Sequence, residues 1–113
     1  MGQLVDWHTH CFLPEHISAE DKALQKRRGV LGTQNAEPDV HRSVIDEAGA
    51  GQFVVIAMPR RAGIHTPHEF IAEYVSRYPG RAVGFGSVHP KEPDAAEEVE
   101  HAITKLGLKG LKL

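Results

Sequence analysis

Four short apolar segments divide the chain, over residues 4–10, 53–59, 82–88 and 108–113. The second is a continuous run of mostly branched residues that is stopped by Pro59, as is typical of a strand buried on both faces. The third has the same character and leads into His89 and Pro90, and the fourth is rich in leucine. The pattern therefore predicts four buried β-strands.

Between these segments the apolar positions recur with a period of about 3.6 residues, which predicts amphipathic helices. Pro38 and Gly49 bracket the first helix, Thr66 and Pro67 are the expected capping and first residues of the second, and Gly107 follows the third. The expected apolar faces are Val40, Val44, Ile45 and Ala48; then Phe70, Ile71, Tyr74, Val75 and Tyr78; then Val99, Ala102, Ile103 and Leu106.

Alternation of apolar strands with helices predicts an α/β fold in which parallel strands are joined by helical crossovers. Residues 12–36 interrupt the alternation with prolines, glycines and the charged run 26–28. We expect an extended loop there, which either covers the mouth of the sheet or is a tolerated surface insertion. The prediction is a single domain over residues 1–113 with four strands and three helices.

Composition narrows the range of partners. The chain has 113 residues, of which 41% are hydrophobic and 25% charged, and its formal net charge of −2 gives no electrostatic footprint for nucleic acid or an anionic membrane. Cys11 is the only cysteine, so no internal disulfide forms, and no apolar run has the length of a membrane span. A signal-peptide pattern is also lacking at the start, so we expect a cytoplasmic protein with a small-molecule substrate.

His8 and His10 end the first predicted strand. Because side chains alternate along a strand, Asp6, His8 and His10 are expected on one face, where two imidazoles one pleat apart can reach a single metal ion. Zinc or another divalent transition metal fits such ligands. The alternative is an ordinary pair of partly buried histidines, since the chain contains 8 His in all.

Position in the fold favours the metal-binding interpretation. Functional groups of parallel α/β proteins gather at the carboxyl ends of the strands, so the polar residues that end or follow the four segments are expected on one rim. These residues are His8 and His10, Arg60 and Arg61, His89, and Lys112. Arg60 and Arg61 are candidates for binding a substrate carboxylate, with a solvated loop pair as the alternative. His89 either contacts substrate or only terminates its strand.

Two further polar residues lie beside the candidate ligands. Asp6 is a candidate for orienting a ligand histidine from behind. If Leu111 and Leu113 face the helices, Lys112 points into the sheet interior, where an unpaired ammonium group is costly. An ion pair with Asp6, extension of the side chain towards the mouth, or a carboxylated lysine bridging two metals would each remove that cost.

Several motifs together resemble the amidohydrolase superfamily. They are residues 6–10 with Pro14 shortly after, Gly84-Phe85 in the third strand after Tyr78-Pro79-Gly80-Arg81, and the terminal run 107–113. The resemblance covers almost the whole chain. It is greatest to the branch of amidohydrolase-related hydrolases and decarboxylases that includes aminocarboxymuconate semialdehyde decarboxylase.

The resemblance implies a TIM-type (β/α)₈ barrel that binds a divalent metal, usually zinc, with His8 and His10 as two ligands. The family's other ligands are a His after the fifth strand, often a His after the sixth, and an Asp after the eighth. None of these has a counterpart in the 113 residues, so the chain corresponds to the N-terminal half of a barrel. The catalytic proton carrier is expected beyond Leu113, and this piece alone is expected to be inactive.

The function implied is metal-dependent hydrolysis of a small carboxylated, amide, ester or lactone substrate by metal-activated water. Non-oxidative decarboxylation is the alternative within the same family. The alternative from another class is a non-catalytic half-barrel that self-associates through its open sheet, because unpaired edges and an exposed apolar face promote association.

Overall fold

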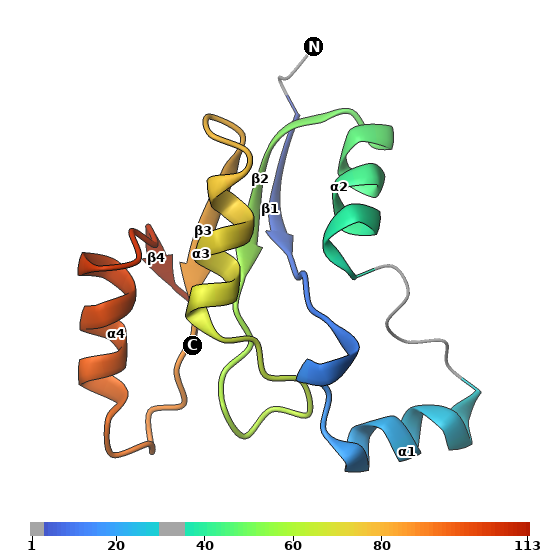
Figure 1. Cartoon of the computed structure of the whole chain (residues 1–113), viewed down its shortest axis with the longest axis vertical. Coiled ribbons are helices and arrows are strands. Elements are labelled where there is room, and N and C mark those ends of the chain that lie inside the picture. The colour runs from blue at the N-terminus through green and yellow to red at the C-terminus, as the bar shows by residue number, and fades with distance from the viewer. Residues whose placement is uncertain (1–3, 30–35) are drawn as a thin grey trace.

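The computed structural model describes residues 4–29 and 36–113, and Figure 1 shows their arrangement. The strands are β1 (Leu4–Thr9), β2 (Ala50–Ile56), β3 (Ala82–Gly86) and β4 (Gly110–Leu111). The helices are α1 (Ala19–Arg28), α2 (Pro38–Glu47), α3 (His68–Ser76) and α4 (Ala95–Thr104), with a 3₁₀ turn, η1, at Pro14–His16.

The four strands form one parallel sheet in the order β1-β2-β3-β4, which is curled as half of a TIM-type barrel. The predicted α/β fold with parallel strands is therefore confirmed. Helices α2, α3 and α4 pack on one face of the sheet (Figure 1). The core between the two layers is centred on Phe53, Val55, Ile71, Tyr74 and Leu108.

A fourth α-helix among the described residues corrects the prediction for residues 12–36. Part of that segment forms η1 and α1, whereas its residues 30–35 lie outside the described residues. Helix α1 buries no residue, so it has no apolar periodicity for a sequence pattern to detect. Its stabilising features are local: the Ser18 side chain accepts a hydrogen bond from the Asp21 amide, and Gly29 ends the helix with φ of 67°.

The predicted cap of α3 is also wrong. Pro67, and not Thr66, occupies the cap position, and no side chain caps the helix. The Thr66 hydroxyl instead accepts a hydrogen bond of 2.6 Å from the amide of Met58, just after β2. Its oxygen therefore accepts a hydrogen bond from the backbone just after a strand, and not from the first turn of a helix.

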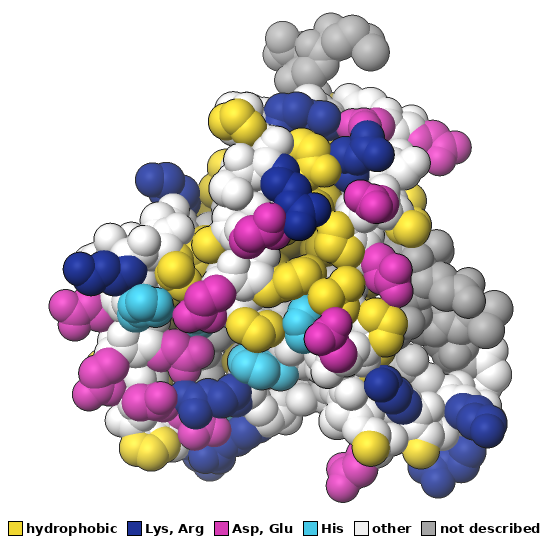
Figure 2. Space-filling view, in the orientation of Figure 1, with side chains coloured by type: hydrophobic (Ala, Val, Ile, Leu, Met, Phe, Trp, Pro, Cys, Tyr) yellow, Lys and Arg dark blue, Asp and Glu magenta, His cyan; other side chains and the backbone are white. Residues whose placement is uncertain are grey.

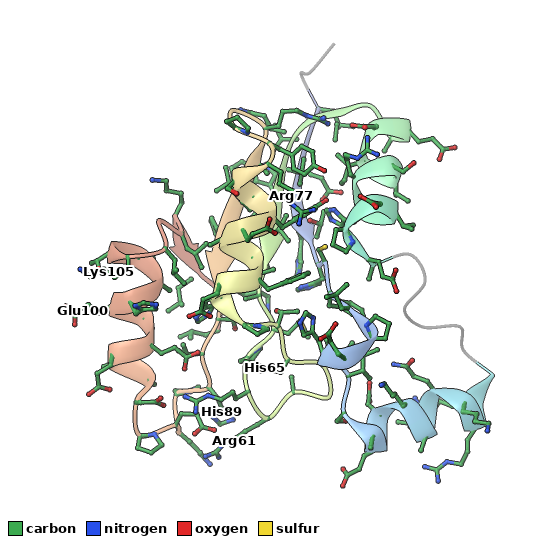
Figure 3. The ribbon with its side chains drawn as sticks, in the orientation of Figure 1. Arg61, His65, Arg77, His89, Glu100 and Lys105 are labelled. Carbon is green, nitrogen blue, oxygen red and sulfur yellow. The ribbon has the colours of Figure 1, made fainter. Side chains whose placement is uncertain are left out.

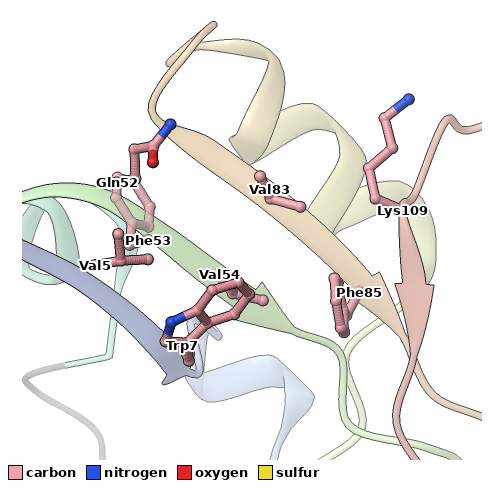
Figure 4. Close-up of a pocket in the computed structure, with 8 residues that line it drawn as sticks. All are labelled: Val5, Trp7, Gln52, Phe53, Val54, Val83, Phe85 and Lys109. Atoms are coloured by element: carbon pink, nitrogen blue, oxygen red, sulfur yellow. The ribbon is translucent and has the colours of Figure 1, made fainter.

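The other face of the sheet carries an open apolar hollow of about 410 Å³ (Figure 4). Its lining residues are Val5, Trp7, Gln52, Phe53, Val54, Val83, Phe85 and Lys109. Trp7 is 70% exposed, which is unusual for so large an apolar side chain. This face is the one that would point into the interior of a complete barrel.

The outer face of the molecule has a different character. Figure 2 shows charged side chains of both signs around this face, with hydrophobic side chains gathered in its middle. Across residues 4–29 and 36–113, no helix is long and apolar enough to cross a membrane.

Candidate metal site

An irregularity in β1 determines where its histidines point. Asp6 pairs with Phe53 and Thr9 with Val55, so three steps along β1 match two steps along β2. Such a bulge places one additional residue in the strand and changes which face the following side chains occupy. Thr9 lies beside the core residue Val55, and its hydroxyl donates to the Val54 carbonyl at 2.6 Å. Alternation on either side of Thr9 then directs His8 and His10 to the open face of the sheet.

Asp6 is on the opposite face from His10, which corrects the expectation that the three side chains share one face. Asp6 lies beside Phe53, whose ring is in the core under the helices, whereas the bulge separates Asp6 from His10. Its carboxylate accepts a hydrogen bond of 3.1 Å from the backbone amide of His8. Asp6 thus contacts a candidate ligand through its backbone amide.

The two imidazoles converge. Nε2 of His8 lies 3.1 Å from Nε2 of His10, with the ring centroids 5.0 Å apart and the planes at 70°. Two nitrogens bound at about 2.0–2.1 Å to one tetrahedral zinc ion are about 3.3 Å apart. The observed separation therefore fits two ligands of one metal with little movement.

His10 is held in the form that a metal ligand needs. Its Nδ1 lies 2.9 Å from the carbonyl oxygen of Ile56, at the end of β2. Since a carbonyl only accepts, Nδ1 carries the proton and Nε2 keeps its lone pair directed at His8. Burial lowers the pKa of His10, the Ile56 bond opposes this shift, and the charges of His8 and Lys112 add to the lowering.

The described residues do not form a complete metal site. Within residues 4–29 and 36–113, no group of three or more His, Cys, Asp or Glu side chains could hold a metal ion. Cys11, next to His10, is fully buried and packs in the core, where burial raises the pKa of its thiol to about 12. Its side chain is therefore part of the hydrophobic core.

Arg60 and Arg61 follow β2 as the sequence indicates, but both form ion pairs with acidic residues of this chain. Arg60 contacts Asp94 and lies 2.8 Å from Glu98, and Arg61 lies 2.6 Å from Glu92. The hydrogen bond from Arg61 lowers the pKa of Glu92. The two arginines therefore join the loop after β2 to the loop after β3 and the start of α4, and this ion-pair network competes with any substrate carboxylate.

The remaining rim residues lie in two different settings. His89 follows β3, and its Nδ1 accepts a hydrogen bond of 3.2 Å from the Lys91 amide within its own turn. Figure 3 shows His89 and Arg61 on loops at the same end of the molecule. Lys112 follows β4, and its ammonium group is near enough to His10 to lower that pKa. Among the described side chains, no ion pair joins Lys112 to Asp6.

Sequence reasoning missed the polar residues that support this rim from the helix side. Thr66 and His68 are 1% and 4% exposed, and they bond to Met58 and Ser87, which follow β2 and β3. The Ser87 hydroxyl in turn donates to the Lys112 carbonyl at 2.6 Å. The residues themselves lie before an amphipathic stripe, where a capping role is the ordinary expectation.

Four parallel strands curled as half of a (β/α)₈ barrel place this protein in the class of α/β-barrel proteins, whose functional groups lie at the carboxyl ends of the strands. The chain belongs to the amidohydrolase family, whose sequence model matches residues 5–113. Neither the comparison with curated proteins nor that with solved structures gave a match. Membership in this family supports a hydrolase-type function.

Proposed function

We propose that His8 and His10 are two protein ligands of a divalent metal, zinc first among the candidates, in a hydrolase that acts on a small carboxylated, amide, ester or lactone substrate. The observation that carries the proposal is the 3.1 Å approach of the two Nε2 atoms at the carboxyl end of β1. A divalent metal, when bound, supplies positive charge that polarises a substrate oxygen and lowers the pKa of water towards about 7.

The chain's own residues contribute binding and orientation. The Ile56 carbonyl holds the proton of His10 on Nδ1, so Nε2 needs no deprotonation before it binds a metal. His8 is exposed and makes no other side-chain hydrogen bond within the described residues, so it is free to adopt the matching tautomer. The nearby Lys112 ammonium favours a substrate with a carboxylate group.

A catalytic zinc site has about three protein ligands plus water. We propose that the third ligand and the proton carrier come from strands outside these 113 residues. Decarboxylation is the alternative reaction for a carboxylated substrate held at the same site, and assays for released carbon dioxide belong beside the hydrolysis assays.

The test is zinc binding by the chain, measured by calorimetry and by competition with a chromogenic chelator. We expect zinc binding by the wild type, and its loss in His8→Ala and in His10→Ala. His89→Ala is the matched control, because it removes a rim histidine whose ring is engaged in its own turn. Equal zinc binding by all four proteins would refute the assignment of these ligands.

Self-association of a non-catalytic half-barrel is a second candidate, and the apolar hollow with Trp7 at 70% exposure favours it. Sedimentation of Trp7→Ser against wild type tests it. The control is Val44→Ser, which removes an apolar side chain that is 49% exposed on α2. Association lost in Trp7→Ser alone supports the second candidate, and a monomeric wild type refutes it.

A further inference from the structure

The segment that leads into α3 fastens the end of β2 by reciprocal hydrogen bonds. The Thr66 hydroxyl accepts from the Met58 amide at 2.6 Å, and the Thr66 amide donates to the Met58 carbonyl at 3.1 Å. Nδ1 of His65 lies 3.1 Å from the same carbonyl. Thr66 is 1% exposed, so no solvent replaces its hydroxyl if it is removed.

These hydrogen bonds to Met58 lie two residues beyond Ile56, whose carbonyl orients His10. Strand β2 ends at Ile56, whose carbonyl is 2.9 Å from Nδ1 of His10. The next amide, that of Ala57, donates to the Phe85 carbonyl at 2.9 Å, and the one after it belongs to Met58. Thr66 therefore fixes the backbone two residues beyond Ile56, where it leaves the strand.

We propose that Thr66 is a positioning residue for His10, acting through the Met58 and Ile56 backbone to keep the His10 proton on Nδ1 and its Nε2 facing His8. The inference rests on the proposed function only in that zinc is the ligand that benefits from this orientation. The bonding pattern itself is a property of the chain without metal.

Replacement of the hydroxyl by a methyl group is the sharpest perturbation. Thr66→Val keeps the branched shape but leaves the Met58 amide without its acceptor, so the backbone that carries the Ile56 carbonyl can move. Loss of the partner that orients a ligand histidine lowers metal affinity by about 10–100-fold, and we expect the lower end because Thr66 acts through intervening backbone. Thr66→Ser retains the oxygen and is expected to restore wild-type affinity.

Two measurements are made on each variant: zinc affinity, and the NMR shifts of the His10 ring nitrogens without metal. In Thr66→Val we expect about 10-fold weaker zinc binding and a shift of His10 towards the tautomer protonated on Nε2. Thr66→Ala also lacks the hydroxyl and serves if the valine variant folds poorly. Ile71→Val is the matched control, since it removes one buried methylene from α3, the helix that this segment leads into, without removing a polar group.

The outcomes separate the two proposals. Unchanged ring-nitrogen shifts in the folded hydroxyl-free variants overturn the role of Thr66, and so does an equal change in Ile71→Val. If the wild type binds no zinc but the His10 ring-nitrogen shifts of Thr66→Val still differ from those of the wild type, the metal proposal fails and the positioning role stands. If the wild type binds zinc and Thr66→Val binds it equally, the positioning role fails alone.

Discussion

Gly84 in β3 packs against Leu108, which precedes β4, and against the α3 side chains Ile71 and Val75, and we expect Gly84→Ala to destabilise the fold. A Cβ at this position would lie 2.7 Å from Cδ2 of Leu108, 3.2 Å from Cγ2 of Ile71 and 3.3 Å from Cγ2 of Val75. Leu108 and Ile71 are 3% and 0% exposed, so neither side chain has free space to move into. The added methyl group therefore overpacks a closed region of the core.

The magnitude follows from two opposing effects. Overpacking a core costs about 1–3 kcal/mol, whereas replacing glycine by alanine restricts the unfolded chain and returns about 0.4–1 kcal/mol. The difference between the two is a net loss in the free energy of unfolding of about 0–2.6 kcal/mol. For a domain of this size that corresponds to a decrease in Tm of up to about 10 °C.

The assay is urea and thermal unfolding of Gly84→Ala, Leu108→Ala and the double variant. Leu108 supplies the nearest atom, so its truncation makes room for the new methyl group, and the double variant is expected to be more stable than the sum of the single effects predicts. Strict additivity, or a higher Tm in Gly84→Ala, would show that Gly84 and Leu108 do not pack as closely as the structure indicates.

Three other predictions concern buried or partly buried groups. Tyr74→Phe is expected to lower the free energy of unfolding by about 1–3 kcal/mol in urea titrations, because the hydroxyl lies 2.7 Å from His41 Nδ1 and His41 Nε2 has no hydrogen-bond partner among residues 4–29 and 36–113. An unchanged free energy of unfolding would refute the bond. Burial lowers the pKa of His41 and of His16, so the unfolded chain binds more protons than the folded one near neutral pH. The free energy of unfolding is therefore expected to fall as the pH decreases below about 6.5. A free energy of unfolding that does not change with pH in this range would contradict this. Cys11, buried with a pKa raised to about 12, is expected to react with a thiol reagent only after unfolding, and rapid labelling of the native protein would contradict that.

Helix α2 shows where periodicity succeeds and where it fails. The pattern predicts a helix with Pro38 near its start and Gly49 just past its end. The structure confirms both limits, because α2 begins at Pro38 and Gly49 follows its cap residue with φ of 77°. The same pattern assigns Val44 to the apolar face, yet Val44 is 49% exposed and His41 is 6% exposed. His41 is buried because its ring packs against the rings of Phe53 and Tyr74. A pattern of hydrophobic positions does not predict such a contact for a histidine.

The rim residues show a similar division. Their order along the chain was predictable, because parallel strands bring successive carboxyl ends to one edge. The partners of Arg60 and Arg61 were not, since Glu92, Asp94 and Glu98 lie more than thirty residues further along the chain and only the packing of α4 brings them close. Acidic side chains of the chain itself therefore pair with the two arginines, which residue type alone would assign to substrate binding.

The sequence by itself determined the parallel α/β architecture and the two histidines at the end of the first strand, because apolar periodicity and residue type are local properties of the chain. Only the tertiary structure decided how these histidines are presented. The bulge in β1 depends on pairing with β2, and the proton on His10 Nδ1 depends on the Ile56 carbonyl 46 residues away. Both features are relations between strands, so they exist only once the strands have paired.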